Sequence, residues 1–194
     1  VPVNLPVKTL KDFVELAKSK PGKLNFGNPG IGSSIDLTAK NLFRIAGINV
    51  TNIGYKGQPQ ALIDLITNEI EISVASLALA LPHIKDGKLK ALAVFTKDRV
   101  KELPDVPTIA EAGYPDAAYL PWYGIYLPAA TPDELVKRIH EAINTALQSP
   151  QVIERLSHAD IPGQPMPLDE LAKLMKADHE RLNEIVKVSH IAVE

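Results

Sequence analysis

The sequence predicts an α/β fold in which a mostly parallel β-sheet is flanked by helices and followed by a helical C-terminal segment. Up to residue 94, short runs of strand-forming residues alternate with runs whose apolar residues recur at helical spacing. This alternation is typical of βαβ units, whose strands are parallel and whose crossovers are right-handed. Beyond residue 128 only helical patterns occur. Ligands of such open sheets bind at the carboxyl ends of the strands.

Four helices and four strands are expected in the first half of the chain. The helices are expected at residues 9–20, 33–46, 58–67 and 77–85, where apolar residues recur every three or four positions. Pro21-Gly22 stops the first helix, and Gly47 is a typical C-terminal cap for the second. The strands are expected at residues 24–26, 50–53, 70–74 and 89–94, with one helix between each strand and the next.

The second half begins with a proline-rich stretch, residues 101–121, which predicts an ordered loop with one helical turn at residues 108–112. The aromatic residues of 119–127 favour a strand, which Pro121 restricts to a sheet edge or a kinked start. Three helices are expected after it, at residues 132–147, 150–157 and 168–188.

Composition excludes several classes of protein. The 194 residues are 45% hydrophobic and 23% charged, with a formal net charge of −2, which is ordinary for a globular chain and lacks the basic excess of a nucleic-acid binder. The chain has no Cys, so a disulfide scaffold, Cys-ligated zinc and thiol catalysis are excluded. The most apolar run, residues 72–84, is too short to span a membrane. Because the chain opens on Val1, we expect that a signal peptide or a structural segment precedes it.

The glycine-rich segment at residues 27–34 is the most informative motif. Gly30 and Gly32 allow a ligand to approach the backbone, and Ser33 and Ser34 are good helix N-caps whose free N–H groups favour an anion. The segment lacks the Lys of a P-loop and the spacing of the dinucleotide fingerprint, so a carboxylate or small anion is expected. The alternative is a glycine-rich turn with a Ser cap and no ligand.

Two further loops follow expected strands. In the first of them, Tyr55 could supply a hydroxyl and a ring wall, Lys56 could supply a positive charge, and Gly57 would allow a ligand to approach closely. The alternative is a solvated Lys56 beside a Tyr55 that covers the edge of the core. Ser76 follows the third strand. The five His residues lack metal-ligand spacing, and no nucleophile, base and orienting group come together. No metal, cofactor or catalytic residue is therefore expected.

Four segments of the chain resemble a single family. They are LNFGNPGIGSSIDL, INVTNIGYKGQPQALIDLITNEIEI, LPHIKDGKLKALAVFTKDRVKELPDVPTIAEAGYP and WYGIYLPAATPDELVKRIHEAI. They are similar to the periplasmic substrate-binding receptors of tripartite tricarboxylate transporters, the Bug-type solute-binding proteins, over nearly the whole chain. The resemblance implies a type II periplasmic-binding-protein fold, with two domains that close over a small carboxylate.

The resemblance also implies how the chain is divided. Residues 6–119 would be the second lobe, an α/β ligand-binding domain, and residues 120–194 the returning strand and helices of an incomplete first lobe. The family's N-terminal segment, which forms much of the other cleft wall, would be lacking. Three positions depart from the family pattern: Ala75 stands where Asp is frequent, and Ile31 and Asp36 replace residues that are usually polar or His.

We therefore expect an extracytoplasmic, periplasmic solute-binding protein, or a truncated form of one, that binds a small organic carboxylate for a tripartite tricarboxylate-type transporter. The membrane subunits of the transporter would be its partners, and no enzyme activity is expected. The expected ligand-binding residues are Asn28, Gly30, Gly32, Ser33, Ser34, Tyr55, Lys56, Gly57 and Ser76.

Two other functions are compatible with the sequence. The first is an oligomeric interaction or assembly module, for instance a homodimer without a ligand of its own, because helices that lack their usual sheet would expose apolar faces. The second is an enzyme that uses the Gly-Ser loop for a phosphorylated substrate, although no catalytic base accompanies that loop.

Overall fold

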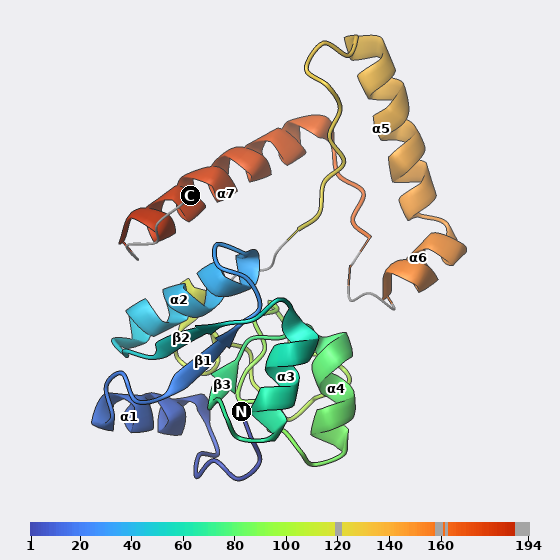
Figure 1. The fold of residues 1–194 in the computed structure, drawn as a ribbon. Helices are drawn as coiled ribbons and strands as arrows, with labels where there is room; N and C mark the ends of the chain where they lie inside the picture. Colours follow the sequence, from blue (N-terminus) through green and yellow to red (C-terminus); the bar gives the residue numbers. More distant parts are fainter. Residues whose placement is uncertain (119–121, 158–160, 162, 189–194) are drawn as a thin grey trace. The chain divides into compact units, whose positions relative to one another are not determined.

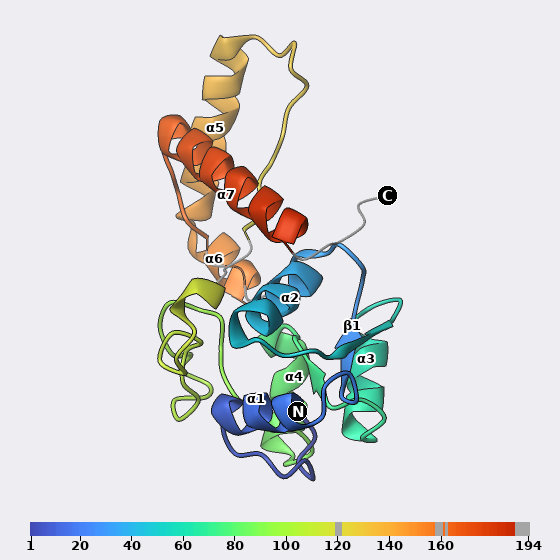
Figure 2. The same ribbon diagram turned by 90° about the vertical axis from the view of Figure 1, so that its left-hand side faces the viewer.

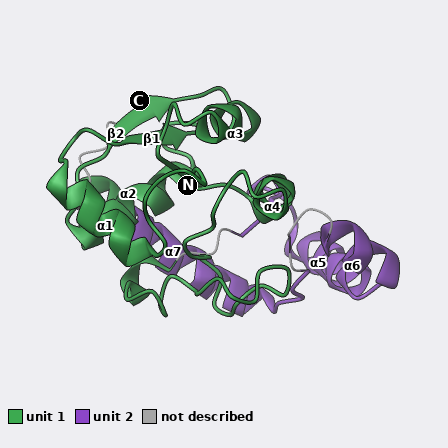
Figure 3. Cartoon of the chain, turned by 90° about the horizontal axis from the view of Figure 1, so that it is seen from below, with its two compact units in different colours: residues 1–121, 185–194 green, residues 122–184 purple. Residues whose placement is uncertain are grey.

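The computed structural model describes residues 1–118, 122–157, 161 and 163–188. The chain divides into two compact units, coloured separately in Figure 3. Unit 1 comprises Val1–Pro121 and Ile185–Glu194, and unit 2 comprises Trp122–Glu184. Each unit is described by itself below.

The centre of unit 1 is a three-stranded parallel sheet in the order β2-β1-β3 (Figure 1). The strands are β1 (Asn25–Asn28), β2 (Thr51–Gly54) and β3 (Ile72–Ser73). Within the register, Phe26 of β1 pairs with Asn52 on one side and Ile72 on the other. The parallel sheet expected in this part of the chain is confirmed, and the carboxyl ends of its three strands lie at one edge.

The helices of unit 1 lie within one residue of the bounds that the sequence predicts. They are α1 (Leu10–Ser19), α2 (Ser34–Ala46), α3 (Gln58–Ile66) and α4 (Leu77–Lys85). A capping box opens α1: Asp12 N donates to Thr9 Oγ1 over 3.1 Å, and Thr9 N donates to Asp12 Oδ2 over 2.9 Å. Gly47 ends α2 with a φ of 64°, the left-handed conformation that glycine adopts without strain.

Two apolar cores cover the two faces of the sheet. Successive residues of a strand point to opposite faces, and β1 shows this clearly. Phe26 packs edge-to-face on Phe43 of α2, with ring centroids 5.3 Å apart, in a core shared with α1. Gly27 faces Ala61 of α3 and Ile70, which belong to the second core. The sheet is therefore sandwiched between α1 and α2 on one side and α3 on the other (Figure 1).

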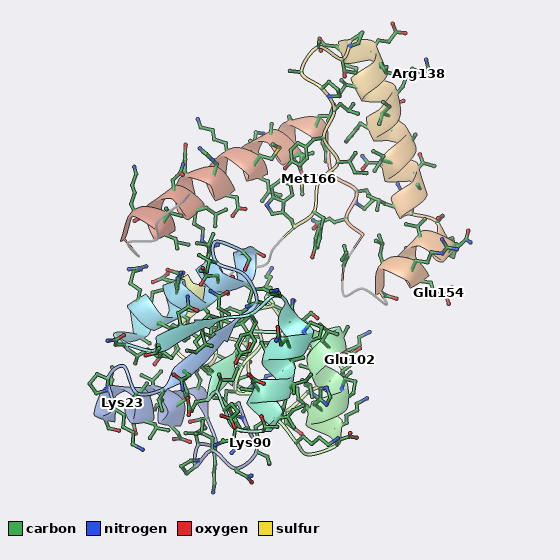
Figure 4. The ribbon with its side chains drawn as sticks, in the orientation of Figure 1. Lys23, Lys90, Glu102, Arg138, Glu154 and Met166 are labelled. Atoms are coloured by element: carbon green, nitrogen blue, oxygen red, sulfur yellow. The ribbon has the colours of Figure 1, made fainter. Side chains whose placement is uncertain are left out.

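The expected strand at residues 89–94 is wrong. This segment forms only isolated bridges, between Pro2 and Leu89 and between Val94 and Thr108. The backbone beside the first bridge is joined by hydrogen bonds from Val3 N to Lys88 O and from Lys90 N to Val1 O. The Nζ of Lys90, labelled in Figure 4, donates to the carbonyl groups of Leu5 and Val7, each over 2.7 Å. The apolar pattern of this segment reflects burial rather than a ladder. Turns follow, and the short 3-10 helix η1 (Pro115–Ala117) packs on α2 (Figure 2).

The strand expected at residues 119–127 is also wrong for its described part, since residues 122–127 form no strand and residues 119–121 lie outside the described residues. The three helices that follow agree with the prediction: α5 (Asp133–Leu147), α6 (Pro150–Ser157) and α7 (Leu168–Val188).

Polar contacts tie unit 2 together. Asn144 of α5 exchanges hydrogen bonds with the backbone of Met166, labelled in Figure 4, over 3.2 and 3.4 Å. Trp122 Nε1 donates to Asp178 Oδ2 of α7 over 2.9 Å. The structure describes every residue of α5 and α6, and none of them is buried. The apolar residues of these two helices are thus at most half-buried, and Leu135 and Ile153 are exposed.

The first test concerns the core beneath β1. Phe26→Ala removes a ring that is 1% exposed, so the free energy of unfolding of unit 1 should fall by about 3–5 kcal/mol. Ile63→Ala on α3 is the control, because Ile63 is 61% exposed and its loss should hardly matter. Urea denaturation followed by circular dichroism measures both. Equal midpoints for the two variants would contradict the described core.

Candidate ligand-binding site

The expected site residues gather where the three strands end. The register pairs Asn28 with Gly54 and Gly27 with Ser73, so the loops after β1, β2 and β3 are neighbours at one edge of the sheet. We call this edge, with residues 28–36, 55–58 and 73–76, the carboxyl edge. All nine residues expected from the sequence belong to it: Asn28, Gly30, Gly32, Ser33 and Ser34 from the first loop, Tyr55, Lys56 and Gly57 from the second, and Ser76 from the third.

A buried carboxylate organises the first loop. Asp36 of α2 is 0% exposed, and its Oδ1 accepts a hydrogen bond from Asn28 Nδ2 over 2.8 Å. Its Oδ2 accepts from the backbone N of Gly32 and from Lys40 Nζ, each over 2.8 Å. The Oδ1 of Asn28 accepts in turn from Gly30 N over 2.9 Å. Asn28 and Asp36 together, which we call the Asn28–Asp36 clasp, therefore satisfy two of the loop's own N–H groups.

The start of α2 keeps some donors open. Ser33 Oγ accepts from Asp36 N over 3.2 Å, and Ser33 N donates to Gly30 O, so this residue caps the helix. By contrast, the backbone N–H groups of Ile31, Ser34 and Ile35 have no acceptor among the described residues. Of the N–H groups expected to meet an anion, those of Gly30, Gly32 and Ser33 are thus already paired within the loop.

The second loop holds one fixed and one free polar side chain. Tyr55 donates its hydroxyl to Asp64 Oδ2 of α3 over 2.7 Å, and its backbone N donates to Asn28 O. Partial burial and then the hydrogen bond to Asp64 raise the pKa of Tyr55 to about 12. Lys56 is exposed and forms no ion pair with a described residue, so its charge is available to an anion.

The third loop is joined to α3. Ser76 N donates to Gln58 Oε1 over 2.8 Å, which connects the end of β3 to the first residue of the helix. Ser76 precedes α4, but its hydroxyl forms no capping hydrogen bond. Ala75 is partly buried against the second core, and Gly57 precedes α3 without a side-chain cap. The loop thus offers the Ser76 hydroxyl beside an apolar surface.

Sequence reasoning missed two important residues. Asp36 follows the N-cap Ser33 by three positions, and this Ser-x-x-Asp spacing suggests a side chain that returns to the backbone. Its actual partner is Gly32 N, and spacing could not reveal Asn28 as the second partner. Gly27 is the second, because an added Cβ would overlap Ile70 Cδ1 and force that buried side chain to move. This contact lies far along the chain.

The described residues lack two further features, a metal-binding cluster and a membrane-spanning helix. Within residues 1–118, 122–157, 161 and 163–188, no three His, Asp or Glu side chains form a group that could hold a metal ion. The helices in that part of the chain are all too short or too polar to cross a membrane.

Comparison with known proteins identifies the family. Residues 1–191 match the model of the tripartite tricarboxylate transporter family receptors. A Pseudomonas sp. (strain P51) protein encoded in the tcbD-tcbE intergenic region is 32% identical over 96% of this chain and 56% of its own length. Bordetella pertussis BugT is 33% identical over 78% of this chain and 46% of its own. The chain therefore spans about half the length of the curated relatives it matches.

Solved structures show the same fold. A Rhodopseudomonas palustris protein with adipate is 28% identical, with a TM-score of 0.82 over 99% of this chain and 64% of that chain. MatC from the same species, with bound malate, is also 28% identical, with a TM-score of 0.78 over 95% and 64%. The resemblance and the fold class expected from the sequence are confirmed. The family is one of receptors rather than enzymes, and the periplasmic binding protein BugD, 26% identical with a TM-score of 0.79, shares the fold.

The environment of Tyr55 gives a test by pH. The folded-state pKa of about 12 exceeds the ordinary value of 10.0, so the neutral phenol stabilises the fold. This contribution is fully present below pH 10.0 and is lost as the pH rises through about 12. Ultraviolet titration of the parent and of Tyr55→Phe, subtracted, should give one tyrosine ionising near pH 12.

Circular dichroism over the same pH range checks that the chain remains folded during this titration. A difference curve centred near pH 10.0 in the folded chain would show that Tyr55 lacks the buried contact with Asp64.

Proposed function

The chain belongs to the family of tripartite tricarboxylate transporter receptors, and from this premise we propose that it is a periplasmic solute-binding protein for a small organic carboxylate. The observation that carries the proposal is the carboxyl edge, where open backbone N–H groups of Ser34 and Ile35 at the start of α2 neighbour the loop of Lys56. A helix start and an exposed ammonium group both attract a carboxylate.

Two relatives support this ligand class. The R. palustris structure named above contains adipate, and MatC contains malate. Both ligands are dicarboxylates, and both proteins have the fold of this chain. In the present proposal one carboxylate of the ligand accepts hydrogen bonds from Ser34 N and Ile35 N, with the hydroxyl of Ser33 beside them. Lys56 compensates the charge, while the ring of Tyr55 and the Ser76 hydroxyl border the site. Asn28 and the glycines Gly30 and Gly32 shape the loop without touching the ligand, and Gly57 leaves room beside it.

The wider role follows from the same premise. Residues 6–119 serve as the ligand-binding lobe and residues 120–194 contribute to the other lobe, and closure of the lobes signals occupancy to the transporter's membrane subunits. Because the chain spans about half the length of its curated relatives, it supplies one wall of the ligand site in this function.

The affinity expected of this wall alone is low. A helix start contributes about 0.3–1 kcal/mol to anion binding, and a charge-assisted hydrogen bond about 1.5–3 kcal/mol. Immobilising the ligand opposes both contributions. A dissociation constant near 1 mM corresponds to about −4.1 kcal/mol, so millimolar binding is the expected range. Amide NMR, which detects such weak binding residue by residue, is the appropriate measurement.

Succinate titrated into the uniformly labelled chain should shift the amide signals of Ile31, Ser34, Ile35 and Lys56. Lys56→Gln should weaken binding about threefold, because an exposed charge contributes up to about 1 kcal/mol. The control is Lys23→Gln, whose Lys precedes β1 at the opposite edge of the sheet (Figure 4) and should not affect the affinity. Gly32 is a poorer target, since its φ of +75° would strain any replacement.

Succinamide, which has the same carbon skeleton without the charges, serves as the ligand control. Equal shifts with succinate and succinamide, or shifts confined to residues outside the carboxyl edge, would contradict the proposal.

A second candidate function is an assembly module, and the exposed apolar side chains of unit 2 favour it. Tyr123 is 76% exposed and Ile125 71%, and Tyr126, Leu135 and Ile153 are exposed as well. Each aliphatic side chain transferred from water to an interface contributes about 1.5–3 kcal/mol, so several together could hold a homodimer.

If the chain assembles through unit 2, its mass by light scattering should rise with concentration above that of one chain. Ile125→Asp should then raise the dissociation constant of the dimer about tenfold or more, because a charge replaces buried apolar surface. Ile63→Asp places the same change on an exposed apolar residue of unit 1 and should have no effect. A constant single-chain mass would exclude this candidate.

A further inference from the structure

The Asp36 carboxylate is the buried charge of the carboxyl edge, with a side-chain exposure of 0%. A buried carboxylate is tolerated only where its oxygens are fully hydrogen-bonded. Asp36 meets this condition through three donors, which are Asn28 Nδ2, Gly32 N and Lys40 Nζ, each at 2.8 Å. It therefore places a negative charge in the first turn of α2, where the helix dipole favours one, and leaves the N–H groups of Ser34 and Ile35 to other acceptors.

The backbone groups that the clasp binds belong to the two glycines of the loop. Gly30 and Gly32 have no side chains to restrict their backbone, and Gly32 adopts a φ of +75°. Asn28 Oδ1 holds Gly30 N, and Asp36 Oδ2 holds Gly32 N. Because both anchors come from fixed elements, β1 and α2, the loop between them has little freedom. The remaining N–H groups, those of Ser34 and Ile35, are left open in a defined arrangement.

We propose that Asp36 is the positioning residue of the carboxyl edge, a built-in anion that holds residues 29–33 in the ligand-binding shape and does not itself touch the ligand. The inference rests on the proposed function for its effect on affinity. Asn28 is its necessary partner, since its amide donates to one side of the carboxylate and its carbonyl oxygen extends the clasp to Gly30.

The geometry of the clasp allows the two side chains to be exchanged. In Asp36→Asn, an amide group must face either Asn28 Nδ2 or the donors Gly32 N and Lys40 Nζ, so one donor always opposes another. In the swap Asn28→Asp with Asp36→Asn, the new Asn donates to the new Asp, and its oxygen still accepts from Gly32 N and Lys40 Nζ. The swap thus keeps every hydrogen bond of the clasp and moves the negative charge from position 36 to position 28.

The experiment compares succinate affinities by amide NMR. Asp36→Asn should raise the dissociation constant about tenfold, within the range of coupling found in a shared hydrogen-bond network. The swap should return it to within about twofold of the parent chain. Asp12→Asn is the matched control, because Asp12 occupies the same third helical position of α1 and accepts from Lys8 N and Thr9 N, away from the carboxyl edge. It should leave the affinity unchanged.

A second readout needs no ligand. Hydrogen exchange of the Gly30 and Gly32 amides should be slow in the parent, fast in Asp36→Asn and slow again in the swap.

Should Asp36→Asn fail to fold, a folded swap with parent-like affinity and exchange supports the inference. Unchanged affinity and exchange in a folded Asp36→Asn, or a swap that restores neither, would overturn it. If the parent chain shows no succinate shifts, the proposed function fails, and the exchange rates still decide whether Asp36 fixes the loop.

Discussion

The parallel pairing of β1 between β2 and β3 is the constraint on which the rest of unit 1 depends. The pairing aligns three strand ends at one edge, and with them the three loops of the carboxyl edge. It also sets which residue of β1 meets which core, with Phe26 toward α1 and α2 and Gly27 toward α3. Because Gly27 has no side chain, Ile70 and α3 can lie close against the sheet, and α3 in turn holds Tyr55 and Ser76 through Asp64 and Gln58.

The Asn28–Asp36 clasp pairs N–H groups that this topology leaves without partners. A strand that leads directly into a helix brings unpaired N–H groups and the positive end of the helix dipole to the carboxyl edge. Asp36 satisfies part of that demand from within the chain, and Lys40 balances its charge. Because the loop is already ordered before the ligand binds, less of the binding free energy is lost in ordering the chain. In the function we propose, this arrangement suits one carboxylate group better than a densely charged anion.

Local signals were sufficient for much of the fold. Helices were predictable because caps such as Ser33 and Gly47 and regular apolar spacing act within a few residues. The segment at residues 89–94 misled because an apolar run is equally compatible with a strand and with a buried irregular segment, and its true partners, Val1 and Leu5, lie over 80 residues away. The glycine loop could be located from its local composition. The clasp of Asn28 with Asp36 could not, because it depends on how the loop bends, and the contact of Gly27 with Ile70 could not, because Ile70 is distant in the sequence.

The two units differ in what holds them together, and this difference bears on function. Unit 1 has two apolar cores and a sheet, so its carboxyl edge rests on rigid elements. Unit 2 relies on polar contacts such as those of Asn144 and Trp122, and each hydrogen bond contributes only about 0.5–1.5 kcal/mol. Ordering each residue costs about 1–2 kcal/mol, so helices with exposed apolar sides require further burial to be stable on their own. The proposed ligand recognition therefore falls on unit 1, and the proposed association falls on the apolar side chains of unit 2.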